Sequence, residues 1–186
     1  DRVSAGIEAA TKDGDLVVIG APVDFLGVNY YTPVVIDRQG RPVQPHPISS
    51  AGWQQVYPQG LDDVLTRLRR DYASPEVLIT ENGVEDVGDR MRPRYMAQHI
   101  HQNWRAVNYN WPVKGYFHWS LVDNSEWAVG YTQDFGLFSF HPATLRRPPT
   151  ASRNPDAAAT PSAQAASTAA TLAGSNAAGS TKNPSR

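Results

Sequence analysis

The chain has 186 residues, a formal net charge of −1 and no cysteine. A charge so close to zero gives no electrostatic basis for binding nucleic acid or an anionic membrane surface, and a chain without cysteine forms neither disulfides nor thiolate metal sites. No apolar run approaches the ~20 residues that a membrane-spanning helix needs. From the charge and the apolar pattern we expect no nucleic-acid or membrane partner. The absence of cysteine leaves the redox compartment undetermined, and the cytoplasm is the expected location.

The first predicted elements are a short helix and a strand. The chain starts at Asp1 with neither an initiator Met nor a secretory signal, so we expect a piece of a larger protein. Residues 4–12 have helical character. Residues 25–31 have the composition of a strand, and strand alternation places Asn29 and Tyr31 on one face near its C-terminal end.

A long loop and a helix follow. Residues 34–58 are rich in Pro and Gly, and a loop of that length is more often functional than idle. It contains Trp53. A helix is predicted from residue 60 to about residue 72, because apolar residues recur there at helical spacing: Leu61, Val64, Leu65 and Leu68.

Residues 77–80 predict a buried strand that ends at a carboxylate, Glu81, followed by an Asn82-Gly83 turn. The carboxyl ends of parallel strands lie where the loops of an α/β fold form a binding crevice. Glu81 is therefore a candidate catalytic residue. The alternative is that Glu81 caps the next helix or pairs with an arginine.

A second helix is predicted over residues 94–108 and a third strand over residues 113–121. His99 and His101 point to different faces of that helix, so we interpret them as packing or surface histidines and not as metal ligands. The helix is expected to bury the apolar stripe of Met96, Ile100, Trp104 and Val107.

Strands, helices and loops in this order bring polar and aromatic residues to one edge of a parallel sheet. Asn29, Tyr31, Glu81 and Trp119 stand at the C-terminal ends of the three strands. A loop after the third strand adds further groups, among them Glu126, Trp127 and Phe135. Aromatic rings can stack on the C–H faces of pyranose rings, and carboxylates accept hydrogen bonds from hydroxyls, so this edge suits a sugar.

The composition changes after the third strand. No Phe, Tyr or Trp occurs after Phe140. Residues 141–186 consist mostly of Ala, Ser, Thr, Pro and Asn, and such a segment cannot bury enough apolar surface to offset the entropy of ordering it. We therefore predict a folded unit over residues 1–140 and a low-complexity, disordered tail over residues 141–186.

Four motifs resemble the C-terminal part of the family 1 glycoside hydrolases, the β-glucosidase family. They lie in residues 24–31, 53–61, 79–83 and 113–137, and the resemblance covers roughly residues 15–138. It implies an α/β fold that is part of a (β/α)8 TIM barrel, with the sixth to eighth strands and the helices between them. It also implies a β-glycoside or oligosaccharide substrate and no cofactor or metal.

The resemblance implies roles for particular residues. Glu81 would be the nucleophile of a retaining mechanism, forming a covalent glycosyl-enzyme, and Tyr31 would orient it. The other residues that match would bind substrate: Trp119 as an aromatic floor, Glu126 and Trp127 on the sugar hydroxyls, Phe135 as a wall, Trp53 near the leaving group, and Asn29 in direct or supporting contact. Several of these, such as Trp127 and Phe135, could instead fill core.

The chain departs from the family pattern in three places. The Thr-x-Asn-Glu-Pro motif of the general acid/base is absent, so we expect the isolated chain to be inactive. Ser125 and Val129 stand where the family usually has Phe and an acidic residue. After Phe138 the family sequence gives way to the low-complexity segment, for which we hypothesise a reading-frame shift or a truncated gene copy; the alternative is a natural linker.

Two other interpretations of the chain are open. It could be a truncated, non-catalytic remnant with at most weak sugar binding, or a plain α/β packing unit with a disordered tail. Three strands of a barrel leave two open edges. The isolated chain is therefore expected to be poorly folded, prone to aggregation or dependent on a partner, the missing N-terminal half of the barrel.

Overall fold

The computed structural model describes residues 10–72 and 76–153. The regular elements, in chain order, are α2 (Asp15–Ile19), β1 (Phe25–Asn29), β2 (Val35–Ile36), β3 (Pro42–Val43), α3 (Gln59–Asp71), β4 (Glu76–Asn82), α4 (Arg92–Asn108), β5 (Val113–His118) and two 3₁₀ helices, η1 (Trp127–Val129) and η2 (Ala151–Arg153). The helix predicted over residues 4–12 lies almost entirely outside the described residues.

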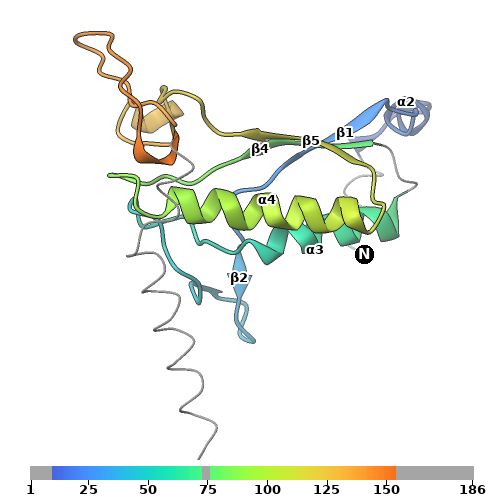
Figure 1. The fold of residues 1–186 in the computed structure, drawn as a ribbon. Coiled ribbons are helices and arrows are strands. Elements are labelled where there is room, and N and C mark those ends of the chain that lie inside the picture. The colour runs from blue at the N-terminus through green and yellow to red at the C-terminus, as the bar shows by residue number, and fades with distance from the viewer. Residues whose placement is uncertain (1–9, 73–75, 154–186) are drawn as a thin grey trace, which may run out of the picture.

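The central feature is a three-stranded sheet in the order β1-β4-β5. Both pairings are parallel, with Val28 opposite Ile79 and Ile79 opposite Tyr116. Helices α3 and α4 lie along one face of the sheet (Figure 1). The predicted alternation of strand, helix, strand, helix and strand is thus present, and it places the C-terminal ends of all three strands at one edge.

The core lies between the sheet and the two helices. Leu61 and Leu65 of α3 pack against Val28 and Ile79 of the strands, as the helical spacing predicted. Val64 and Leu68 are partly buried at the margin of this cluster. Burial of this apolar surface is the main stabilising contribution to the unit.

The predicted buried stripe of α4 is wrong. Ile100, Trp104 and Val107 are 46%, 59% and 51% exposed. The face of α4 that is turned inward is largely polar: Arg92, Tyr95, His99, Gln102, Asn103 and Ala106. Apolar periodicity finds the apolar face of a helix but not the neighbour that covers it, and no described element covers this one.

The histidines of α4 behave as packing and surface residues, as expected. His99 is fully buried, its Nδ1 lies 2.8 Å from the carbonyl oxygen of Tyr95, and its ring lies 3.8 Å from the Tyr95 ring. Burial lowers the pKa of His99 to about 4. His101 is exposed and stacks on Trp104.

The loop predicted over residues 34–58 is more regular than expected. It contains the antiparallel pair β2-β3 and an isolated bridge between Ile48 and Gln55. Backbone pairing needs no apolar periodicity, which is why composition alone missed it.

The predicted boundary at residue 140 also differs from the structure. His141 donates its N–H to the carbonyl of Arg146 at 3.0 Å, and Thr150 donates to that of Leu137 at 2.9 Å. Residues 141–153 therefore fold back on the body of the chain through hydrogen bonds, those of Thr150 with Leu137 and of Ser152 with Asp89, and not through large apolar side chains. Residues 154–186 lie outside the described residues. Within the described ranges, no helix has the length and apolar character needed to span a bilayer.

Candidate active site

A cleft of about 830 Å³ opens where the strands end. Its lining combines two carboxylates with several aromatic rings, and it includes every residue that the sequence singled out for a site: Asn29, Tyr31, Trp53, Glu81, Trp119, Glu126, Trp127 and Phe135. Thr32, Val129 and Gln133 complete the lining. Residues from four separate stretches of sequence thus meet around one cavity of the size of a small-molecule site.

The centre of the cleft is a hydrogen bond between Tyr31 and Glu81. The Tyr31 hydroxyl donates to Glu81 Oε2 at 2.7 Å. A register shift after Val28 brings Asn29 opposite Glu81, so the end of β1 lies beside the end of β4. Burial and this hydrogen bond raise the pKa of Tyr31 far above its usual value, which keeps the phenol protonated and able to donate.

The two carboxylate oxygens of Glu81 differ in their contacts. Within the described part of the chain, Glu81 forms neither an ion pair with an arginine nor a helix cap, so neither structural alternative is seen. Oε1 accepts no hydrogen bond from the described residues, whereas Oε2 is engaged by Tyr31. A carboxylate held at one oxygen and open at the other has the geometry of an oriented nucleophile.

Trp119 joins Glu126 to the same cleft. Its indole Nε1–H donates to Glu126 Oε1 at 3.0 Å, and its backbone N–H donates to the carbonyl of Asn82 at 2.9 Å. Gly83 leaves room for this strand end, because a Cβ there would collide with the carbonyl oxygen of Trp119. The indole is therefore fixed beside the strand that carries Glu81.

The other aromatic residues differ in burial. Phe135 is buried and meets Tyr31 edge to face at 6.2 Å, so it both packs and forms a wall. Trp127 is 95% exposed and Trp53 is 45% exposed, which excludes a core role for either among the described residues. Two large indoles at the mouth of a cleft are surface that a sugar or an aglycone could cover.

Known proteins include clear relatives of this chain. The sequence profile of glycosyl hydrolase family 1 matches residues 2–154, most of the chain. The chain belongs to glycosyl hydrolase family 1. It is 38% identical over 162 residues to a β-galactosidase of Saccharolobus solfataricus, covering 78% of this chain and 32% of that protein. It is 36% identical over 152 residues to β-glucosidase A of Thermotoga maritima, covering 72% and 33%.

Solved structures give the same relationship. The family 1 β-glucosidase of Thermotoga maritima superposes with a TM-score of 0.68 at 34% identity, covering 74% of this chain and 34% of that one. The same enzyme in complex with glucoimidazole gives 0.71 at 32% identity, covering 82% and 38%. The chain therefore spans about a third of the length of these relatives, and its α/β fold is part of a TIM barrel.

One residue of this family 1 chain that sequence reasoning missed is Asn82. It is fully buried, and its Nδ2 donates to the carbonyl of Tyr30 at 2.7 Å and to the Tyr95 hydroxyl at 2.9 Å. Its Oδ1 accepts from the Tyr116 hydroxyl at 2.8 Å. Asn82 thereby ties all three strands and α4 together directly behind Glu81. The sequence showed only an Asn-Gly pair, which indicates a turn.

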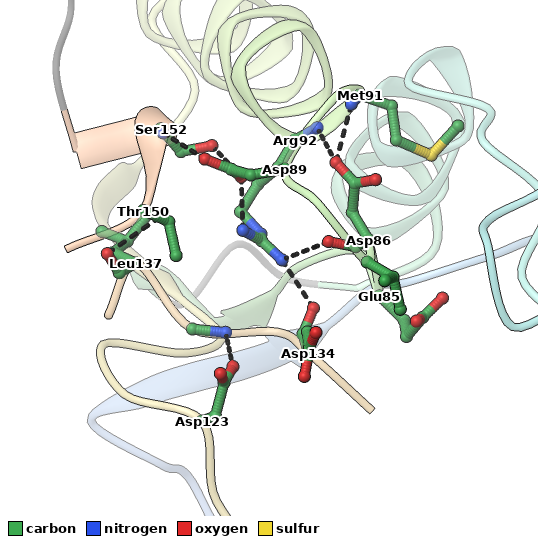
Figure 2. Close-up of polar contacts among 12 residues, drawn as sticks. Glu85, Asp86, Asp89, Met91, Arg92, Asp123, Asp134, Leu137, Thr150 and Ser152 are labelled. Carbon is green, nitrogen blue, oxygen red and sulfur yellow. Dashed lines mark hydrogen bonds and ion pairs between the residues drawn. The ribbon is translucent and has the colours of Figure 1, made fainter. Parts of the chain in front are cut away.

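A buried arginine supports the loop that carries Glu126. Arg92, at the start of α4, forms an ion pair with Asp89. It also donates to the backbone carbonyls of Asp86 at 3.3 Å and Asp134 at 2.5 Å (Figure 2). Because Asp134 precedes Phe135, this guanidinium fixes one wall of the cleft from behind.

Acidic side chains complete this support. Asp86 Oδ2 accepts the N–H groups of Met91 and Arg92 at 2.7 and 2.9 Å, which caps the first turn of α4. Asp123 Oδ1 accepts the N–H of Gly136 at 2.6 Å, and Asp89 accepts from Ser152. Figure 2 shows these groups gathered around Arg92. They explain why residues up to 153 stay with the folded unit.

Proposed function

We propose that this chain is the nucleophile-bearing part of a retaining β-glycosidase of the β-glucosidase type. Its strands β1, β4 and β5 would be the sixth to eighth strands of the barrel. The observation that carries the proposal is the 2.7 Å hydrogen bond that holds one oxygen of Glu81 inside a cleft lined by Trp119 and Glu126. Relatives named as β-glucosidase and β-galactosidase support a β-glucoside or β-galactoside substrate.

In the proposed reaction, Glu81 Oε1 attacks the anomeric carbon and the glycosidic bond breaks with its electron pair leaving on the aglycone oxygen. Tyr31 holds the attacking carboxylate in place. Trp119 would lie under the sugar, and Glu126 would accept hydrogen bonds from its hydroxyls. Water then releases the sugar from Glu81, which needs the general base of a complete enzyme.

The isolated chain would lack hydrolytic turnover for a chemical reason. Retaining hydrolysis uses two carboxyls about 5–5.5 Å apart, one of which protonates the leaving group. Glu81 and Glu126 are the carboxylates that line the cleft, and Glu126 already accepts from Trp119. The acid/base would come from the part of the barrel that this chain does not contain.

The uncovered surfaces fit that proposal. The outer edges of β1 and β5 have no strand partner in the described structure, and Ile100, Trp104 and Val107 leave an apolar stripe open on α4. These are surfaces that further strands and helices of a closed barrel would cover. The N-terminal barrel half is therefore the proposed partner.

A mechanism-based label tests the nucleophile alone. 2,4-Dinitrophenyl 2-deoxy-2-fluoro-β-D-glucoside has a leaving group that departs without protonation, so the missing acid is not needed, and the fluorine slows release of the sugar. We expect intact-mass analysis of the full chain to show one fluoroglucosyl group, mapped to Glu81 and absent from Glu81→Gln. The matched control Glu76→Gln, at the opposite end of β4, should still be labelled.

The second candidate function is weak sugar binding without chemistry, favoured by the intact Trp119–Glu126 contact. Absence of the label from the unmodified chain, together with quenching of Trp fluorescence by β-glucosides, would support this remnant over the glycosidase proposal.

A further inference from the structure

A second carboxylate lies just beyond the end of β4 and is more deeply buried than Glu81. Glu85 is 1% exposed, and its carboxylate accepts hydrogen bonds from Ser50 Oγ at 3.0 and 2.9 Å and from the Ala51 N–H at 2.5 Å. No Lys, Arg or His of the described ranges pairs with it, and Figure 2 shows its side chain turned away from the guanidinium of Arg92. A buried carboxylate is costly without donors, so its position depends on Ser50 and Ala51.

These donors are the tip of a small hairpin. Ser49 donates its N–H to the carbonyl of Gln54 at 2.9 Å, Gly52 donates to that of Ser49 at 2.9 Å, and Ile48 pairs with Gln55. Gly52 has a φ of 80°, a conformation that glycine adopts without strain. Trp53 follows Gly52 directly, so the contacts that hold the hairpin tip in place also hold the backbone of Trp53.

The other side of Trp53 is held by Gln54. Gln54 is fully buried, and its Nε2 donates to the carbonyls of Gly83 at 2.6 Å and Tyr31 at 3.2 Å. Its Oε1 accepts the N–H of Glu85 at 3.1 Å. Glu85 thus contacts the hairpin twice, through its side chain at the tip and through its backbone at Gln54.

We infer that Glu85 is a positioning residue that holds Trp53 at the mouth of the cleft and thereby sets the preference for the group attached to the sugar. Trp53 lines the cleft, whereas Trp119 and Glu126 hold each other by a separate hydrogen bond. Loss of the Glu85 contacts should therefore disturb the Trp53 wall and leave the sugar floor in place. The part of this inference that concerns the leaving group rests on the proposed function.

The positioning role can be tested without a ligand. The full chain is labelled with 5-fluorotryptophan, and the five Trp residues are assigned in ¹⁹F NMR spectra by single Trp→Phe variants. In Glu85→Ala and in Ser50→Ala we expect the Trp53 resonance to shift or broaden while those of Trp119 and Trp127 stay in place. The matched control Glu76→Ala should move none of them. An unchanged Trp53 resonance, or equal movement of all five, would overturn the inference.

The specificity role is tested with two glucosides that share the sugar. Dissociation constants of phenyl β-D-glucoside and methyl β-D-glucoside are measured by Trp fluorescence for the unmodified chain and Glu85→Ala. We expect roughly a three- to tenfold loss for the phenyl glucoside, the size of one aromatic contact, and little change for the methyl glucoside. Equal losses for both would refute the specificity role. Binding of neither glucoside by the unmodified chain would count against the proposed function, while the ¹⁹F spectra still decide the positioning.

Discussion

Tyr31 and Glu81 meet although they lie on different strands, and the Tyr31 hydroxyl donates to Glu81 Oε2 at 2.7 Å. The contact depends on the parallel pairing of β1 with β4 and on the register shift after Val28. Glu81 Oε1 has no hydrogen-bond partner among the described residues, and the contact at Oε2 restricts rotation of the carboxylate before any substrate arrives.

Removal of the phenol should therefore slow attack by Glu81. Tyr31→Phe removes the hydrogen bond to the carboxylate, and a bond of this kind contributes about 1.5–3 kcal/mol. We therefore expect labelling by the fluoroglucoside to slow by about 10- to 100-fold. The rate is followed by intact mass against time. Tyr72→Phe, on an exposed tyrosine, is the control, and equal rates in both variants would show that Tyr31 does not orient the nucleophile.

Asn82 is predicted to be the most sensitive polar position of the sheet. Asn82→Ala leaves the Tyr116 hydroxyl and the Tyr30 carbonyl without their partner in a buried setting. Unsatisfied buried groups of this kind should lower the free energy of unfolding by about 2–4 kcal/mol. Urea unfolding followed by circular dichroism measures the change. Asn108→Ala, at an exposed side chain that bonds the carbonyl of Trp104, should change it far less. A similarly small effect for Asn82→Ala would contradict the prediction.

Sequence reasoning reached the strand and helix order and the residues at the strand ends because both depend on local signals. The places of Trp53, Glu126, Trp127 and Phe135 in the cleft were implied by the family resemblance. The strand that ends at Glu81 is a short apolar run followed by a turn, and α3 shows a clear helical period. Parallel strands must then bring their ends to one edge. Given that topology, no further information is needed to place four residues near one another: Asn29, Tyr31, Glu81 and Trp119.

The failures have two physical causes. The β2-β3 pair was missed because backbone pairing leaves no apolar period, whereas the others involve a partner distant in sequence. The apolar stripe of α4 is conspicuous, yet the face that turns inward is the one that carries Tyr95, which contacts Asn82 of β4. The clamp between Glu85 and Ser50 joins residues 35 apart, and nothing in either local sequence indicates it. The order of residues 141–153 comes from backbone pairing and from Asp89, which composition does not report.

The open surfaces predict complementation. We expect the N-terminal two-thirds of Thermotoga maritima β-glucosidase A, a relative of which this chain covers 33%, to restore hydrolysis of an aryl β-glucoside when both chains are produced together. The reason is that the added strands would pair with the free edges of β1 and β5 and would bring the missing acid. Colour release from p-nitrophenyl β-D-glucoside is the measurement.

Glu81→Ala in the complemented pair is the decisive control, since it removes the proposed nucleophile and should abolish the activity. Activity that survives in this variant would show that the nucleophile lies elsewhere. Soluble association without activity, seen by co-purification, would indicate that the surfaces fit and that the catalytic assignment is wrong.

The last prediction concerns acid stability. Burial lowers the pKa of His99 to about 4, from an ordinary value near 6.5. Between these two values the unfolded chain binds a proton that the folded chain does not, so the free energy of unfolding must rise with pH across this window. His99 thus stabilises the fold only when neutral, and its contribution is lost as the pH falls from about 6.5 toward 4.

His99→Phe keeps a ring against Tyr95 and removes the titration. We expect the free energy of unfolding of the unmodified chain to fall by about 2–3 kcal/mol more between pH 7 and pH 4.5 than that of His99→Phe, measured by urea unfolding at each pH. Carboxylates and His118 titrate in both chains and cancel in the comparison. The His101→Phe variant, at an exposed histidine, should keep the full pH dependence of the free energy of unfolding. If His101→Phe showed as weak a pH dependence as His99→Phe, burial of His99 would not be the cause of the pH dependence.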